Sequence, residues 1–464
     1  MTASATSQLA RFAAETTPDD LPDGVAEAIR ASIIDTVAVM VAGQSQGRGV
    51  SELLEITTRE FRDGQATIVG HAGRFQPRAA ATVNGAMTHQ LDFDDTHDSA
   101  VVHPTANSLP ISLALAETRG ASGAELLTAV AVGNEVACRM GKALTRLMFE
   151  YPWVRPPVLG MFGAVAAGGR MLGLSADEIE NAWGLLLPRA AGTLACLVEP
   201  GSWVRTMRDA FSADSAALAL SLAQAGVQGD RLPLEGKYGL FEAYFDGDYS
   251  VGTLTDGLGS EWAVEEVSLK PWACCREVHG NLTALFDIIE KHSLRARDIS
   301  EIRIKVGATN IKLCEPAEVR RHPRQKADAL CNLPFNLAVA ATHGRIPLDI
   351  YTPEGLADPA VRAMAERVSW ETDETQDRHG TLEPGAVQVV RTDGSVVAAT
   401  AEIARGHPQL PLTPAQLKQK YLDCFAVSEV LGSPAATELH ESLSVLHEVR
   451  DVNELTRLLR PVQP

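Results

Sequence analysis

The chain has 464 residues, of which 45% are hydrophobic and 22% charged, and it carries a formal net charge of -18. The length predicts two domains with a sizeable buried core. An acidic surface repels nucleic-acid backbones and anionic membranes, so neither is an expected partner. The N-terminus shows neither a signal peptide nor a long apolar run, and the seven cysteines form no CxxC pair. These features predict a cytoplasmic protein with reduced thiols and without a zinc or iron–sulfur site.

Apolar residues recur at helical spacing through the first half of the chain. Val25, Ile29, Ile33 and Val37 are spaced four apart and predict a helix over 22–42. Short glycine or proline breaks separate further segments that are rich in alanine and glycine. Nearly all of the first 225 residues are therefore predicted to be helical. The other helices are expected at 78–91, 108–118, 123–144, 158–172, 176–195 and 210–225.

The pattern changes near Val264. Residues 301–306 alternate polar and apolar side chains and predict a half-buried strand. Residues 386–401 contain two strand-like runs around an Asp-Gly turn, which predicts a hairpin. Helices are expected at 281–293 and 358–368, and again over 414–459. We predict a mainly α fold, in which both chain ends (1–265 and 405–464) form a large all-α helical domain. A smaller α+β lid domain (266–404) is inserted between them.

A dense polar cluster lies between two of the predicted helices. Residues 89–98 and His103 together hold four carboxylates and three imidazoles, with Leu91, Phe93 and Val102 among them. A solvated loop is one interpretation. The interleaved apolar residues favour a partly buried loop, in which titratable groups acquire shifted pKa values and defined hydrogen bonds.

Two kinds of chemistry could use this cluster. Asp94-Asp95-x-x-Asp98 has the pattern that holds magnesium in all-α enzymes acting on prenyl diphosphates. No second magnesium motif accompanies it, and aromatic residues make up only 5% of the chain, which is poor for stabilising carbocations. The other possibility is general acid–base catalysis by His103, oriented or charge-tuned by Asp92, with Thr96 as a hydrogen-bond donor.

The same segment resembles the signature of the MmgE/PrpD family. The residues that carry the resemblance are Asn84-Gly85, His89, Leu91 to Thr96 and His103-Pro104. Matches continue in order along the chain at 34–36, 160–164, 268–280 and 328–335. The family includes 2-methylcitrate dehydratase, cis-aconitate decarboxylase and iminodisuccinate epimerase. The resemblance implies a homodimer with a helical domain and an α+β lid, and an enzyme that needs no cofactor and no metal.

The resemblance also implies site residues. Asp92, Thr96, His103 and Lys270 match positions that line the family's active site. Lys270 precedes Pro271 and Trp272, so it could be partly desolvated and serve as a base or as a carboxylate anchor. A surface salt bridge is the alternative for Lys270. His279 could be either a wall of the site or a helix cap.

The chain departs from the dehydratase and decarboxylase pattern at two places. Residues 151–157 lack the histidine that those relatives carry before the central helix, and they contain Tyr151 and Arg155. A Lys-x-Leu-His segment is replaced by Arg205-Thr-Met-Arg208. Arginine stays protonated, so it binds carboxylates and does not shuttle protons. A solvated helix face is the alternative interpretation of Arg205 and Arg208.

These observations predict a lyase or isomerase that removes a proton α to a carboxylate of a small di- or tricarboxylate. Cations aimed at that carboxylate would stabilise the charge that develops. Lys270 and His103 are expected to move protons, and Tyr151 is a further titratable candidate. The residues expected to bind the substrate are Arg205, Arg208, Arg155, Arg276 and His279. A 2-methylcitrate dehydratase-like hydro-lyase and an iminodisuccinate epimerase-like isomerase both stay open. The magnesium-dependent prenyl-diphosphate enzyme and an inactive binding homologue are the alternatives.

Overall fold

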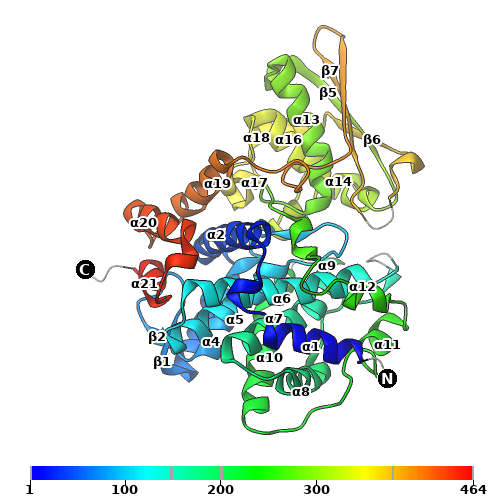
Figure 1. Cartoon of the computed structure of the whole chain (residues 1–464). Helices are drawn as coiled ribbons and strands as arrows, with labels where there is room; N and C mark the ends of the chain where they lie inside the picture. The colour runs from blue at the N-terminus through cyan, green and yellow to red at the C-terminus, as the bar shows by residue number, and fades with distance from the viewer. Residues whose placement is uncertain (1–2, 147–149, 199–201, 379–380, 462–464) are drawn as a thin grey trace.

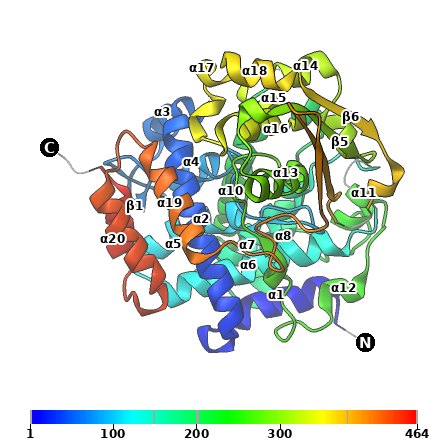
Figure 2. The same cartoon turned by 90° about the horizontal axis from the view of Figure 1, so that it is seen from above.

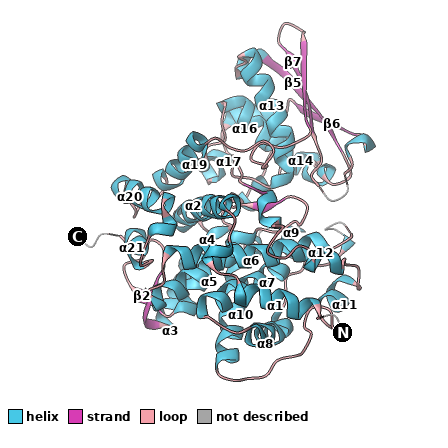
Figure 3. Cartoon of the chain, viewed as in Figure 1, coloured by secondary structure: helices cyan, strands magenta, loops and turns pink. Residues whose placement is uncertain are grey.

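The computed structural model describes residues 3–146, 150–198, 202–378 and 381–461. Helices dominate the chain, which confirms the mainly α prediction (Figures 1 and 3). No helix among these residues has the length and apolar character needed to cross a membrane.

The first half of the chain folds into a bundle of packed helices. Within it, α6 and α7 lie side by side, α4 packs against α10, and α5 packs against α7. A methyl group on Gly163 of α7 would lie 2.5 Å from the carbonyl oxygen of Gly133 on α6, so glycine permits this close approach. The helices are α1 (Ala5–Glu15), α2 (Asp23–Gln46), α3 (Val50–Glu60), α4 (Pro77–Thr88), α5 (Pro104–Arg119), α6 (Gly123–Ala143), α7 (Arg155–Leu172), α8 (Ala176–Leu186), α9 (Ala195–Val198), α10 (Val204–Gln224), α11 (Leu240–Phe245) and α12 (Val251–Thr255).

The sequence from residue 299 to 401 supplies a four-stranded sheet with the order β6-β5-β7-β8. Strand β5 (Ile299–Val306) pairs parallel with β6 (Val368–Thr372) and antiparallel with β7 (Gly385–Arg391), which forms a hairpin with β8 (Val396–Ala401). The predicted strand and hairpin are therefore confirmed. The helices around the sheet are α13 (His279–His292), α14 (Ala317–Arg321), α15 (Lys326–Leu330), α16 (Leu333–His343), α17 (Pro353–Leu356) and α18 (Pro359–Ala365), and α13 packs on β7 and β8.

The last part of the chain returns to the helical bundle. Helix α19 (Pro414–Ala426) and α20 (Ser433–Ser444) both contact α2, and α21 (Asn453–Thr456) lies beside α20 (Figures 1 and 2). A buried ion pair of 2.6 Å joins Lys420 of α19 to Asp35 of α2. The two chain ends are therefore packed together. The boundaries at residues 265 and 405 stay predictions.

Two expectations about the first 225 residues were wrong. The helix predicted over 176–195 ends at Leu186, because Pro188 cannot continue the helical hydrogen bonds and a single 3-10 turn follows. Strands β1 (Arg62–Thr67) and β2 (Arg74–Phe75) interrupt the helices. Gly64 allows their close pairing, since a methyl group there would lie 1.8 Å from the carbonyl oxygen of Phe75.

Candidate active site

The polar segment 89–103 is a buried loop between α4 and α5 rather than a solvated one. Two of its residues form strand β3 (Thr96–His97), which pairs antiparallel with β4 (Val267–Ser268). This pairing places the loop next to Lys270. The Thr96 hydroxyl donates to the carbonyl oxygen of Val102 at 3.3 Å, so it holds the loop in shape. Its predicted role as a donor to the substrate stays a prediction.

Asp92 joins two cations from distant parts of the chain. Its Oδ1 lies 2.5 Å from Nζ of Lys270, and its Oδ2 lies 2.8 Å from Nη2 of Arg205 on α10. Lys270 also donates to the backbone oxygen of Asp92 at 3.0 Å. The aspartate adopts a φ of 48°, which is uncommon for a residue other than glycine and indicates a constrained backbone. Lys270 is completely buried, so the surface salt-bridge interpretation is wrong.

The charge state of Lys270 follows from its neighbours. Burial disfavours its charge, but the carboxylates of Asp92 and Asp94 outweigh burial and raise the Lys270 pKa. Burial likewise opposes the charge of Asp92, yet Lys270, His89 and Arg205 bring the Asp92 pKa well below its usual range. Lys270 is thus an ammonium at neutral pH. In this state Lys270 can bind an anion or donate a proton, which favours the predicted carboxylate anchor over the predicted base.

Asp94 holds two imidazoles. Its Oδ1 lies 2.8 Å from Nδ1 of His89, and its Oδ2 lies 3.1 Å from Nδ1 of His103. Nδ1 of His103 is also 2.9 Å from the backbone oxygen of Asp95, which can only accept. Nδ1 therefore carries the hydrogen, and the neutral ring has its lone pair on Nε2. The side chain of His103 is 12% exposed, and its Nε2 makes no hydrogen bond with the described residues. His103 has the geometry of a general base.

His89 was not among the predicted site residues, although it lies in the polar segment. Its ring is edge-on to that of His103, with centroids 4.6 Å apart. Burial and the nearby charge of Arg208 lower the His89 pKa to about 3, so the ring stays neutral. Burial opposes the charge of Asp94, but His89, His103 and Lys270 keep the Asp94 pKa well below its usual range. His89 thus fixes an ionised Asp94 beside His103.

Arg208 supplies hydrogen-bond donors that the protein itself does not use. It lies one turn after Arg205 on α10 and is only 5% exposed, so the solvated-face interpretation is wrong. Its Nε and Nη2 make no hydrogen bond with the described residues, and Nε lies 3.7 Å from the Asp209 carboxylate. Burial raises the Asp209 pKa to about 6, with Arg208 opposing that rise, so Asp209 is mostly ionised at neutral pH and faces Arg208 without a hydrogen bond to it. Unused donors on a buried cation suit a substrate carboxylate.

Arg276 and His279 differ from the prediction. Nε and Nη2 of Arg276 donate to the two carboxylate oxygens of Asp98 at 2.9 and 3.0 Å. Nη2 also donates to the hydroxyl of Ser268. Nη1 donates to the backbone oxygen of Arg405 and to Nδ1 of His279. These contacts use all five donors of the guanidinium. The other nitrogen of His279 lies 3.2 Å from the carbonyl oxygen of Cys274. Both residues therefore fix the segment that follows Lys270, and neither has a free group for a substrate.

Tyr151 and Arg155 lie at the start of α7. Their ring and guanidinium stack with a centroid distance of 5.9 Å, and Arg146 lies over the same ring at 5.5 Å. Among the described residues no hydrogen bond, ion pair or ring contact joins either residue to Asp92, Lys270 or His103. Burial raises the Tyr151 pKa, so the buried phenol stays protonated. Their predicted roles in catalysis and substrate binding stay predictions.

Comparisons with known proteins identify the family of the chain. The sequence models of the MmgE/PrpD N-terminal and C-terminal domains match residues 7–251 and 272–445. The chain belongs to the MmgE/PrpD family. It is 25% identical to cis-aconitate decarboxylase of Aspergillus terreus, over 98% of this chain and 95% of that protein. It is 25% identical to a cis-aconitate decarboxylase-like protein of Aspergillus oryzae (98% and 97% covered) and 24% identical to human cis-aconitate decarboxylase (96% and 92% covered).

The three aspartates of the DDxxD pattern do not act together in this MmgE/PrpD chain. Asp94 binds the two histidines, while Asp95 accepts from the hydroxyl of Thr105 at 2.5 Å. Asp98 binds Arg276 through both oxygens. Each carboxylate thus has its own protein partner, which argues against a shared magnesium ion.

Among the described residues, two other groups of donor atoms lie close enough together to be considered for a metal. In the first, both imidazole Nδ1 atoms of His89 and His103 already face Asp94 at hydrogen-bond distance. In the second, Asp92 lies near Cys275 and Cys331. The oxygens of Asp92 are bound by an ammonium and a guanidinium, which would repel a cation. Neither group fits a metal well.

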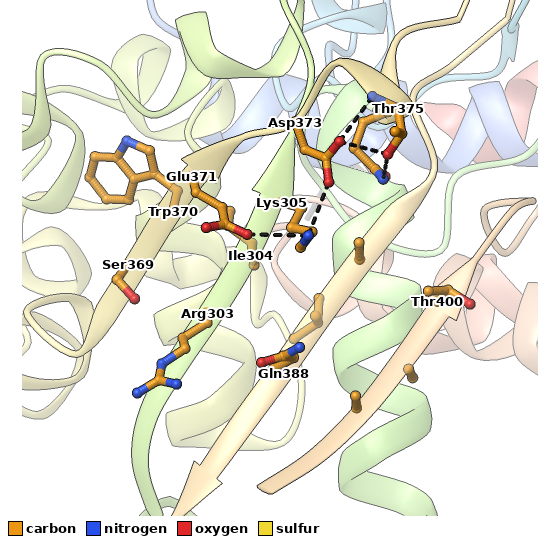
Figure 4. A pocket seen from close by; sticks show the side chains of 15 residues that line it. Arg303, Ile304, Lys305, Ser369, Trp370, Glu371, Asp373, Thr375, Gln388 and Thr400 are labelled. Atoms are coloured by element: carbon orange, nitrogen blue, oxygen red, sulfur yellow. Dashed lines mark hydrogen bonds and ion pairs between the residues drawn. The ribbon is translucent and has the colours of Figure 1, made fainter.

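A cavity of about 520 Å³ lies elsewhere, on the sheet formed by β5 to β8 (Figure 4). Lys305 points to Asp373 at 3.0 Å and to Glu371 at 3.3 Å. This cation is neutralised by its neighbours, so the cavity is a poorer site for an acidic substrate than the Asp92 region.

Proposed function

We propose that this MmgE/PrpD chain is a cofactor-independent lyase that removes a proton next to a carboxylate of a small di- or tricarboxylate. The observation that carries the proposal is the pairing of two units in one buried region. One is the Asp94–His103 pair with a free Nε2. The other is the group of Lys270, Arg205 and Arg208, in which Arg208 keeps two hydrogen-bonding nitrogens that no described residue uses.

The geometry supports a division of roles. Arg208, with its unused donors, and Arg205 would bind the carboxylate next to the reacting carbon. Nε2 of His103 would take the proton from that carbon, and Asp94 would stabilise the imidazolium. The carboxylate would then gain negative charge as an enolate forms. The ammonium of Lys270 would stabilise this charge from a completely buried position, where electrostatic stabilisation is strongest.

The relatives named cis-aconitate decarboxylases support a lyase. An epimerase-like isomerase is a second candidate, because the site holds both a base and a protonated acid. His103 could remove a proton and Lys270 could return one. We further propose that residues 266–404 act as a lid on the helical domain, that the protein is a homodimer, and that it works in the cytoplasm. The pairing of β3 with β4, which joins the catalytic loop to the lysine segment, supports the lid.

The test is proton NMR in deuterated water, with chelator-treated protein and citrate, 2-methylcitrate, cis-aconitate and iminodisuccinate. We expect one acid to lose a C–H signal α to a carboxylate. His103→Gln should slow this exchange by about 10²–10⁴-fold, because it removes the base. An alkene, carbon dioxide or the other stereoisomer as product would distinguish dehydratase, decarboxylase and epimerase.

The opposite results are equally informative. No exchange with any of the four acids would contradict the proposed function. Ligand binding without exchange would favour the inactive binding homologue. Activity that appears only on addition of magnesium and a prenyl diphosphate would favour the prenyl-diphosphate enzyme.

A further inference from the structure

Lys326 is a buried lysine that the proposed chemistry does not use. It begins α15 and is 9% exposed. Its Nζ donates to the carbonyl oxygen of Gln46, at the end of α2, at 3.1 Å. Among the described residues no carboxylate forms an ion pair with it. An ammonium that is withdrawn from water with a single carbonyl partner is costly unless an anion joins it.

Arg48 further disfavours the charge of Lys326. Arg48 lies two residues beyond Gln46, and its guanidinium lies 5.6 Å from the centroid of the Trp203 ring. No carboxylate of the described residues pairs with Arg48. Burial, followed by repulsion from Arg48, lowers the Lys326 pKa to about 7. Lys326 and Arg48 are thus two basic residues that repel each other and that no described carboxylate pairs, so an anion between them would be stabilised.

Hydrogen bonds connect the segments that carry Lys326 and Arg48 to the segments around Asp92 and Arg205. On the α15 side, Leu330 O accepts from the backbone of Cys275 at 2.9 Å, and Sγ of Cys331 lies 3.9 Å from Oδ2 of Asp92. On the other side, Gln90 receives the backbone N–H of Arg48 at 3.2 Å and donates to the carbonyl oxygen of Thr206 at 3.2 Å. Thr206 follows the Asp92-bound Arg205. Only a few residues therefore separate Lys326 and Arg48 from Asp92 and Arg205, both along the α15 segment and through Gln90.

We propose that Lys326 and Arg48 bind a second carboxylate of the substrate, remote from the carbon that loses its proton. This inference rests on the proposed function and makes it more specific. The substrate would place one carboxylate at Arg205 and Arg208, and another at the junction of α15 with the end of α2. Its chemical class is an acid with at least two carboxylates separated by a short carbon chain. Binding would also join α15 to the helical bundle, since Lys326 already contacts α2.

The test is isothermal titration with propane-1,2,3-tricarboxylate and with the same acid carrying one terminal carboxamide. In the wild type the amide should bind about 10–100-fold more weakly, the range expected for loss of a charge-assisted contact. In Lys326→Met, which keeps the apolar stem, the affinity for the acid should fall by the same range. The affinities for acid and amide should then differ by less than about threefold. Arg48→Gln should also reduce the difference in affinity between acid and amide. Lys291→Met, an exposed lysine on α13, is the control and should retain the wild-type ratio.

An unchanged ratio of acid to amide in Lys326→Met and Arg48→Gln would overturn the inference. Equal weakening of acid and amide would also overturn it, because that result indicates a structural role. If Lys326→Met does not fold, Arg48→Gln decides the question, since Arg48 is exposed. Proton exchange by the wild type together with an unchanged ratio would refute this inference alone. Absence of both binding and exchange would refute the proposed function as well.

Discussion

Replacing Asp92 with asparagine removes the anion that two buried cations share. Lys270 lies 2.5 Å from one carboxylate oxygen of Asp92 and Arg205 lies 2.8 Å from the other. At an effective dielectric constant of about 20, the gross attraction in each pair is about 6 kcal/mol, and most of it offsets the cost of desolvation. Asp94 remains 4.0 Å from Lys270 and would compensate part of the lost charge. Removal of one partner of a buried pair typically costs about 3–5 kcal/mol, and we expect Asp92→Asn to fall in this range.

The expected loss can be measured as a change in melting temperature. An unfolding entropy of about 2.1 cal/mol/K per residue corresponds, over 464 residues, to about 1 kcal/mol/K. Asp92→Asn should therefore lower the Tm by about 3–5 °C in differential scanning calorimetry. The double variant Asp92→Asn/Lys270→Met should be more stable than the sum of the single effects by about 2 kcal/mol, because it no longer leaves the ammonium unpaired. A Tm within about 1 °C of the wild type, or additive effects in the double variant, would refute the buried ion pair.

Two further predictions concern Asp95 and Arg276. Burial raises the Asp95 pKa to about 7, so the folded state holds a proton on Asp95 between about pH 4 and pH 7 that the unfolded chain releases. The Asp95 contribution to stability therefore falls as pH rises through this window. In thermal scans, the Tm of Asp95→Asn relative to that of the wild type should increase by a few degrees from pH 4 to pH 7. A Tm difference between the two proteins that does not change with pH would contradict the raised pKa. Arg276→Gln leaves Asp98 without its partner and should lower the Tm by about 3–5 °C while KM changes less than about threefold. Arg205→Gln is the comparison and should raise KM at least tenfold, whereas a larger KM effect for Arg276→Gln would restore Arg276 as a substrate ligand.

Local sequence patterns were sufficient for most of the fold. The alternation at 301–306 and the Asp-Gly turn at 393–394 correspond to β5 and to the β7–β8 hairpin. Helix ends were predicted less well. The helix that begins at Arg155 was expected at residue 158, because the sequence alone does not show that Pro156 and Pro157 occupy its first turn.

The sequence predicted the residues of the candidate site better than their roles. The resemblance implied a site with Asp92, Thr96, His103 and Lys270, and the departure from the family pattern at 205–208 added Arg205. The structure brings Asp92, Lys270 and Arg205 into direct contact. Sequence reasoning gave Arg276 a substrate-binding role because arginine suits carboxylates. It could not show that Asp98, Ser268 and a backbone carbonyl use all of its donors. Whether a buried cation is free depends on contacts between distant segments, which no local pattern encodes.

The charge state of Lys270 shows why the sequence leaves two roles open for it, a base or a carboxylate anchor, and why the structure favours the anchor. Burial alone would lower the pKa of a lysine, and its apolar neighbours Pro271 and Trp272 suggested that effect. The structure adds Asp92 at 2.5 Å and Asp94 at 4.0 Å, and these two anions reverse the direction of the shift. The proposed proton acceptor is therefore His103, because the backbone oxygen of Asp95 fixes its hydrogen on Nδ1 and leaves the lone pair on Nε2. The charge on Lys270 and the lone pair on His103 are therefore consequences of one loop, residues 92–95, which holds both side chains.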